Sequence, residues 1–251
     1  GLPIPAMSSK LVLSQAFPTT GGSVDQVELG SRLRAAREEK NLTLRSLASK
    51  IDVSSSFLSQ IENGKTKPSV DTLYALVRQL EISIDAVLGL AAVSGPETEE
   101  FRPQATFVLQ SAEEAPVLEM ENGVRWERLA VLPGLDIEAL RVTYQPGAAS
   151  SIEGRLMRHL GYEHIAMISG ELSLRIEFEE YPIRAGDTLA FDSQRPHMFL
   201  NPGSVPAIGI WYVFGRKALN NAASHYPEQP VDKHVERLNT AVDVLQSFRE
   251  S

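Results

Sequence analysis

The strongest constraint on this chain is a change in the period of its apolar residues after residue 90. Between residues 27 and 90, apolar residues recur every three or four positions, the spacing of helices packed on a common core. Beyond residue 105 they alternate with polar residues in short runs separated by Gly, Pro and Asp. Many short strands at this spacing indicate a sandwich or barrel. The sequence therefore predicts a multidomain fold, with an all-α domain followed by an all-β domain.

Composition divides the chain into five parts. Residues 1–24 are rich in Ser, Thr, Gly and Pro and are predicted to be flexible. A helical domain is predicted for residues 25–90, a linker for residues 91–104 and the β domain for residues 105–216. The C-terminal segment, residues 217–251, is predicted to contain an amphipathic helix. Its apolar residues form one stripe: Val235, Leu238, Val242 and Leu245.

Helix start signals divide the helical domain into five short helices. A hydroxyl-bearing residue stands just before four of the apolar-periodic runs, as N-cap residues do. These residues are Thr43, Ser54, Ser69 and Ser83. Asp52 separates the second run from the third and tolerates the left-handed backbone conformation of a tight turn.

The stretch SSSFLSQIENGKTKPS, residues 54–69, carries the first functional pattern. Phe57, Leu58 and Ile61 have the spacing of the buried face of a helix from Ser55 to Asn63. A tight turn joins this helix to the preceding one, which makes a helix-turn-helix. Its polar face can enter the major groove, where Gln suits adenine, and the lysines beyond it can meet phosphates. The residues predicted to bind DNA are Ser54, Ser55, Ser56, Ser59, Gln60, Asn63, Lys65 and Lys67.

The segment from Leu33 to Gly89 resembles the Xre/lambdoid-repressor family of helix-turn-helix domains. The resemblance implies a structural ion pair between Arg37 and Glu62. It also implies base contacts from Ser55, Ser56 and Gln60. Two positions depart from the family pattern: Leu44 stands where a phosphate-binding Gln is common, and Asp52 stands where the turn usually has Gly.

Charge differs between the two domains. The whole chain has a formal net charge of −8, but residues 27–90 carry +1 and residues 91–251 carry −9. Acidity in the β part therefore does not exclude DNA binding by the helical part. Because one small, nearly neutral domain binds DNA weakly, we expect a homodimer on an inverted repeat of double-stranded operator DNA. The alternative is a helical protein-interaction domain.

A second set of polar residues falls on predicted strands. His159 and Glu163 flank the start of one strand, and His197 begins a later one. A barrel could bring the three side chains together inside. Two imidazoles and a carboxylate are plausible ligands for a first-row metal ion. The alternative is a pocket in which the same side chains hydrogen-bond an organic ligand.

The same region, roughly residues 105–216, resembles the cupin double-stranded β-helix. The motif MRHLGYEHIAMISG keeps a family His and Glu as His159 and Glu163, and RPHMFLN keeps another His as His197. Met157 replaces the remaining His, and a thioether is a poor ligand for hard divalent ions. The resemblance implies a divalent metal (Zn, Fe, Mn or Ni) on the three retained positions.

Other side chains are candidates for a ligand pocket. Arg141 and Tyr144 lie on a predicted strand, and an inward-facing Arg would bind a carboxylate in bidentate fashion. Further candidates are Arg128, Arg155 and Trp211. Each of these side chains could instead face solvent. His164 directly follows Glu163, so we expect it on the opposite face of the strand.

These patterns predict a one-component transcriptional regulator, not an enzyme, whose cupin domain senses a small-molecule effector and modulates operator binding. One alternative is a metal-dependent cupin enzyme with a DNA-binding head. Another is a constitutive DNA-binding protein whose cupin domain only holds a dimer together. The missing fourth ligand and the DNA-reading domain argue against turnover. Because no stretch approaches the roughly 18 apolar residues of a membrane span, we expect a cytoplasmic protein without membrane contact.

Overall fold

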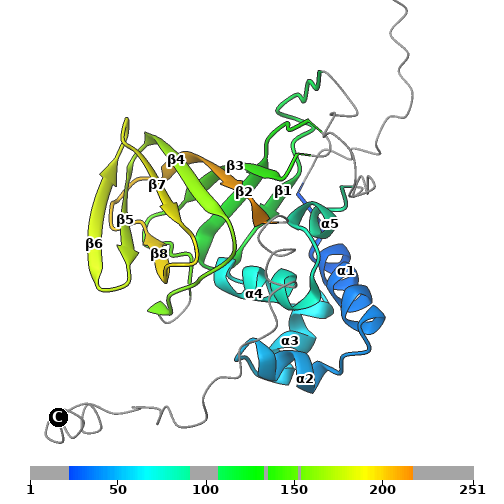
Figure 1. Cartoon of the computed structure of the whole chain (residues 1–251). Coiled ribbons are helices and arrows are strands. Elements are labelled where there is room, and N and C mark those ends of the chain that lie inside the picture. The colour runs from blue at the N-terminus through cyan, green and yellow to red at the C-terminus, as the bar shows by residue number, and fades with distance from the viewer. Residues whose placement is uncertain (1–22, 91–106, 133–134, 152–153, 217–251) are drawn as a thin grey trace, which may run out of the picture. The chain divides into compact units, whose positions relative to one another are not determined.

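The α-helices precede the strands in the part of the chain that is described, and a short 3-10 helix (Glu121–Gly123) lies among the strands (Figure 1). The computed structural model describes residues 23–90, 107–132, 135–151 and 154–216. The predicted linker and the predicted C-terminal helix lie outside these residues, as does most of the N-terminal segment. Among the described residues, no helix is long and apolar enough to span a bilayer. The prediction of a helical domain followed by a β domain is confirmed.

Five helices form the first domain, as predicted. They are α1 (Gln26–Glu39), α2 (Leu44–Lys50), α3 (Ser55–Glu62), α4 (Val70–Leu80) and α5 (Ile84–Leu88). The side chains of the four predicted N-cap residues each accept a hydrogen bond from a backbone N–H in the first turn. Asp25 caps α1 in the same way. Since each such cap stabilises a helix by about 1 kcal/mol, the helix starts are encoded locally.

Turns between the helices use the left-handed backbone conformation. Asp52, between α2 and α3, has φ 55°, as the sequence predicts for this turn. Gly64, after α3, has φ 66°, and a Cβ atom there would lie 2.7 Å from the backbone nitrogen of Val27. Only glycine fits this close approach. The chain therefore leaves α3 abruptly and directs the following lysines away from the helix.

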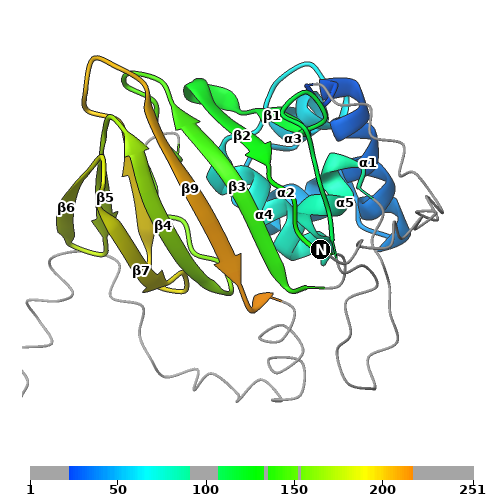
Figure 2. The same ribbon diagram turned by 90° about the horizontal axis from the view of Figure 1, so that it is seen from above.

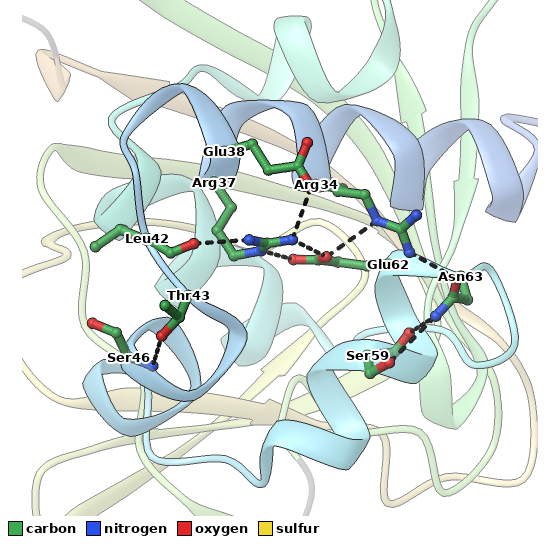
Figure 3. Close-up of polar contacts among 9 residues, drawn as sticks. All are labelled: Arg34, Arg37, Glu38, Leu42, Thr43, Ser46, Ser59, Glu62 and Asn63. Carbon is green, nitrogen blue, oxygen red and sulfur yellow. Dashed lines mark hydrogen bonds and ion pairs between the residues drawn. The ribbon is translucent and has the colours of Figure 1, made fainter.

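A buried ion pair holds α1 against α3 (Figure 3). Nε of Arg37 donates to Oε1 of Glu62 at 2.7 Å, and Nη2 donates to Oε2 at 2.9 Å. Nη1 of Arg37 also donates to the carbonyl of Leu42 at 2.8 Å. Both charged side chains are buried, and the bidentate geometry compensates their lost hydration. The ion pair implied by the family resemblance is therefore present.

Nine strands among the described residues form two antiparallel sheets. The larger sheet has the order β1-β2-β3-β9-β4-β7, and the smaller has the order β6-β5-β8. Figure 2 shows β9 lying between β3 and β4. The strands are β1 (Val117–Glu119), β2 (Val124–Arg128), β3 (Ile137–Tyr144), β4 (Tyr162–Ser169), β5 (Glu171–Ile176), β6 (Glu179–Arg184), β7 (Thr188–Asp192), β8 (His197–Leu200) and β9 (Ala207–Phe214).

Alternation along the strands divides their residues between core and surface. In β4, Glu163, Ile165 and Met167 are buried, and the residues between them are exposed. All the predicted strands are present, and Gly186, at φ 92°, marks the turn between β6 and β7. The short strand β1 was not predicted, because three residues are too few to show a period.

The helices and strands share one compact unit that ends at Arg216. Backbone hydrogen bonds join the two domains, including Asp71 N–H to the Ser150 carbonyl at 3.1 Å. The Val24 N–H donates to the Val117 carbonyl at 2.7 Å. Ser23 and Val24 were predicted to end a flexible segment, and that prediction is wrong for these two residues because Ser23 forms a bridge with β1.

We predict that Glu62→Ala lowers the free energy of unfolding by about 3–5 kcal/mol, because it leaves the Arg37 guanidinium buried without its partner. Urea denaturation followed by circular dichroism measures the loss. Glu38→Ala is the matched control, since Glu38 also contacts Arg37 but its side chain is 61% exposed. We expect the control to lose no more than about 0.5 kcal/mol. Equal losses in the two variants would show that the buried Arg37–Glu62 pair contributes no more to the free energy of unfolding than the exposed Glu38 contact does.

Candidate DNA-binding surface and ligand cavity

The polar face of α3 is open to solvent. Ser55, Ser56 and Gln60 are exposed, whereas Leu58 and Ile61 are buried against the helical core. The helix thus has the two faces that the sequence predicts. The helix is capped by the predicted DNA-binding residue Ser54, whose Oγ accepts from Phe57 N–H at 3.0 Å. Its hydroxyl is therefore used within the protein as well as being exposed.

The end of α3 contains a small polar network (Figure 3). Nδ2 of Asn63 donates to the Ser59 carbonyl at 2.7 Å, and Nη2 of Arg34 donates to Oδ1 of Asn63 at 2.7 Å. Nε of Arg34 also approaches Glu62 at 3.4 Å. Sequence reasoning missed Arg34, because the helix α1 that carries it lies far from α3 in the chain. Its half-exposed guanidinium binds Asn63, two residues before the predicted phosphate contact Lys65 in the chain.

Three predicted side chains meet inside the β domain. Nε2 of His159 lies 2.7 Å from Oε1 of Glu163, and Nε2 of His197 lies 3.2 Å from the same oxygen. All three residues are buried, and their candidate ligand atoms lie within 4.8 Å of one another. Neither Nε2 atom has a well-aligned hydrogen-bond partner. The three ligand atoms therefore converge on a shared position, as metal ligands do.

The charge state of this cluster follows from burial and from its neighbours. Burial, aided by the charge of Arg216, lowers the pKa of His159 from 6.5 to about 4 against the opposing effect of Glu163. Burial alone would raise the pKa of Glu163, but hydrogen bonding and charge from the two histidines hold it well below its usual range. At neutral pH the site therefore combines an ionised carboxylate with an uncharged His159.

Contacts at the Nδ1 atoms decide how each imidazole can act. Nδ1 of His197 lies 2.7 Å from the Arg195 carbonyl, so it donates there and leaves Nε2 with a free lone pair. Nδ1 of His159 lies 3.1 Å from the Leu160 carbonyl but also 3.2 Å from Nη2 of Arg216. The Leu160 carbonyl can only accept and the Arg216 guanidinium can only donate, so the two contacts of His159 Nδ1 require opposite tautomers. Metal binding through Nε2 requires the tautomer with the proton on Nδ1, which donates to the Leu160 carbonyl.

The residues fit a divalent cation when His159 carries its proton on Nδ1. His159, Glu163 and His197 then supply two imidazole nitrogens and a carboxylate oxygen, a set suited to first-row metals. Met157 is buried beside them and is bridged to His197 by backbone hydrogen bonds. The position of the family's remaining His therefore does face the cavity, where a thioether now stands.

The cavity beside the cluster is small and mostly apolar, and Glu163 is the cluster residue that lines it. Its volume is about 10 Å³, room for roughly one water molecule. The lining includes Glu163, Met157, Tyr144 and the chain's two tryptophans, Trp126 and Trp211. Tyr144 and Trp211, predicted as pocket residues, are therefore brought to the cluster.

Three arginines predicted as pocket candidates lie elsewhere. Arg141 is on the opposite face of β3, and its guanidinium binds Glu127 at 2.6 and 2.8 Å. We therefore correct its assignment to the ligand site: residues on β3 alternate, and Leu140, Val142 and Tyr144 take the cavity face.

The other two arginines contact the helical domain. Arg128 binds Asp85 of α5 at 2.6 and 3.0 Å. Nη1 of Arg155 donates to the Asp52 carbonyl at 3.2 Å. His164 is exposed on the outer face of β4, as expected.

Two cavity residues come from the helical domain and were missed. Tyr74 on α4 lines the same cavity as Glu163, and its ring stacks on His159 with 4.2 Å between ring centroids. Val70, one turn earlier on α4, also lines the cavity. A signal exists in the sequence: these two apolar residues stand four apart beside the main apolar stripe of α4, so the helix has more apolar surface than one core needs.

Comparisons with known proteins agree with both domain types. Residues 33–87 match the helix-turn-helix family, and residues 140–213 match the cupin domain family. The HTH-type transcriptional regulator PuuR of Escherichia coli (strain K12) is 28% identical over 176 residues, which cover 68% of this chain and 86% of PuuR. The immunity repressor protein of Bacillus phage phi105 is 36% identical over 73 residues, covering 29% of this chain and 51% of the repressor.

A solved structure has the same fold. The crystal structure of an HTH_3 family transcriptional regulator from Vibrio cholerae superposes with a TM-score of 0.53 at 18% identity. The superposition covers 76% of this chain and 96% of that one. The order of a helix-turn-helix domain and a cupin domain is thus shared with a known protein.

We predict that acid destabilises the metal-free protein through His159. Its pKa is lower folded than unfolded, so the unfolded chain binds more protons between about pH 6.5 and pH 4, and stability falls as the pH falls. The expected loss from this group is about 2 kcal/mol between about pH 7 and pH 5. Urea titrations with EDTA present measure it. In His159→Gln, the share of this acid-induced stability loss that comes from His159 should disappear. In His164→Gln, a change on the exposed face, the full loss should remain.

Proposed function

We propose that this DNA-binding transcriptional regulator, which joins a helix-turn-helix domain to a cupin domain, changes its operator binding when a small-molecule effector enters the cupin cavity. The observation that carries the proposal is the combination, in one compact unit, of an exposed polar recognition helix and a buried cavity with a His–Glu–His cluster. The first serves to read DNA, and the second serves to bind a ligand.

The recognition helix α3 reads bases from the major groove. Gln60 is the residue suited to a bidentate contact with adenine, and the serines at the start of the helix are short and less selective. Lys65, Lys67 and Arg34 neutralise phosphates and set the register of the helix on the duplex. The helix has the exposure that this role needs, because its opposite face is buried in the helical core.

Operator binding occurs as a homodimer on an inverted repeat. One helix-turn-helix domain with a net charge near +1 makes few phosphate contacts, so its affinity alone is low. Two domains related by a twofold axis meet two half-sites and add their contacts. The cupin domain supplies the second function of the chain: its occupancy selects between arrangements of the two domains that bind the operator differently.

The effector binds at His159, Glu163 and His197, with Tyr144 beside them. A neutral imidazole and an ionised carboxylate offer both donor and acceptor groups in an apolar surrounding, which gives specificity for a small polar metabolite. An amino acid, a polyamine or an organic acid has suitable chemistry. A divalent metal (Zn, Fe, Mn or Ni) held by the same three side chains would supply a Lewis-acidic centre for an oxygen of the effector.

The cavity binds its ligand without turning it over. The thioether of Met157 stands where the cupin family pattern has its fourth ligand, and a thioether is a poor ligand for hard divalent ions. PuuR, which is similar over 68% of this chain, is itself named a transcriptional regulator. Since its target is the bacterial chromosome, we expect the protein to act in the cytoplasm.

We predict that Gln60→Ala abolishes preference for the operator and leaves dimerisation intact. The lost base contact should reduce discrimination between operator and unrelated DNA by about 1–3 kcal/mol. Operator fragments selected from genomic DNA, followed by footprinting, measure the preference. Lys65→Ala is the matched control: it should weaken binding to all sequences and lower the salt dependence by about one phosphate contact. A footprint unchanged by Gln60→Ala would refute the role of α3.

We predict that His197→Ala removes the response to effector and leaves effector-free operator binding unchanged. A thermal-shift screen with metabolites identifies the effector, and operator titrations with and without it measure the response. Native mass spectrometry of the same samples reports whether each chain retains a divalent ion and whether the variant loses it. His164→Ala is the control, because this exposed residue on β4 faces away from the cavity. An effector response that survives in His197→Ala would exclude the cluster as the sensor.

A further inference from the structure

The ring of Tyr74 fills the part of the cavity next to His159. Tyr74 belongs to α4 of the DNA-binding domain and is only 5% exposed. Its ring stacks on His159 at 4.2 Å and lies 5.4 Å from the ring of Trp126. With this ring in place, the cavity retains about 10 Å³. An effector larger than a water molecule therefore has no room while Tyr74 is present.

We propose that Tyr74 closes the cupin site from the DNA-binding domain, so that its ring and the effector compete for one space. This inference rests on the proposed function and specifies its regulation. The space that the ring vacates is bounded by Trp126, Tyr144 and Trp211 and ends at the His–Glu–His cluster. It suits a small ligand with a flat apolar body and one polar group, much like the phenol that now occupies it.

Arg216 holds the ring in place. Its guanidinium carbon lies 4.3 Å from the centroid of the Tyr74 ring, a cation–π contact. The same guanidinium approaches Nδ1 of His159 at 3.2 Å and binds Glu138 at 2.9 Å. A ligand that takes His159, whether an organic group or a cation, therefore binds an imidazole whose Arg216 neighbour also contacts Tyr74. Occupation of the cluster and closure by Tyr74 are coupled through this one side chain.

Two contacts between the domains link the position of Tyr74 to the recognition helix. Asp71, in the first turn of α4, donates its backbone N–H to the Ser150 carbonyl of the cupin domain at 3.1 Å. Arg155 of the cupin domain donates to the Asp52 carbonyl, in the turn that precedes α3, at 3.2 Å. Both contacts require the two domains to stay docked. The effector thus has different affinities for the docked and released arrangements, which is the condition for regulation.

Phenol, the ring of the tyrosine side chain, is the probe for the first test on the full-length chain. Tyr74→Ala should bind phenol saturably, with a dissociation constant at least about ten-fold lower than wild type. Emission from Trp126 and Trp211 reports binding, because both tryptophans of the chain line the cavity. Tyr74→Phe keeps the ring and should behave as wild type. Tyr212→Ala removes an exposed tyrosine and should also bind phenol as wild type does.

Amide hydrogen exchange tests the coupling to the DNA-binding domain. In Tyr74→Ala the Asp71 amide should exchange at least about ten-fold faster than in wild type, because its acceptor belongs to the other domain. The Leu76 amide, within α4, should keep its protection. If Tyr74→Ala fails to fold, shown by loss of Leu76 protection, Tyr74→Leu takes its place, since leucine keeps an apolar contact without the phenol ring.

Two results would overturn the proposal. Equal phenol affinity in wild type and in the folded variant would mean that Tyr74 does not occupy ligand space. Phenol binding by the variant without faster exchange at Asp71 would mean that the ring fills the cavity without controlling docking. Neither result bears on effector sensing itself, which is tested by the operator response of His197→Ala. The two proposals therefore fail separately.

Discussion

Helix α4 is packed on two faces at once, and both domains depend on that double burial. Leu73, Leu76 and Leu80 belong to the core shared with the other helices, whereas Val70 and Tyr74 line the cavity between the sheets. A helix with apolar residues over so much of its circumference is stable only when enclosed. The DNA-reading domain therefore completes its own core and the wall of the cupin cavity with the same eleven residues.

Local signals in the sequence predicted local structure well. The four hydroxyl N-caps, the left-handed turn at Asp52 and the alternation that sends Glu163 inward and His164 outward all depend on neighbouring residues. The His–Glu–His cluster was predictable for another reason: its two motifs carry a recognisable spacing. Features that depend on distant segments were not predictable. The contact of Arg34 with Asn63 and the placement of Tyr74 against His159 each join residues from different parts of the chain.

Arg141 illustrates a limit of a different kind. A strand has two faces, and the sequence predicts which face an arginine occupies only when one face is clearly apolar and the other polar. On β3 both faces carry apolar and polar residues. Pairing settles the question, because β3 lies between β2 and β9 and directs Leu140 and Val142 to the cavity. The arginine that does reach the cluster is Arg216, just beyond the last strand, and its Nη2 lies 3.2 Å from Nδ1 of His159.

The strand order has a consequence for biosynthesis. The ribosome releases the helical domain first, and domains generally fold as they emerge. The larger sheet, however, cannot close until β9 is made, because β9 is inserted between β3 and β4. Until then Val70 and Tyr74 lack the part of the cavity wall that Trp211 of β9 supplies. These two apolar residues of the DNA-reading domain are therefore fully covered only after nearly all of the cupin domain has been synthesised.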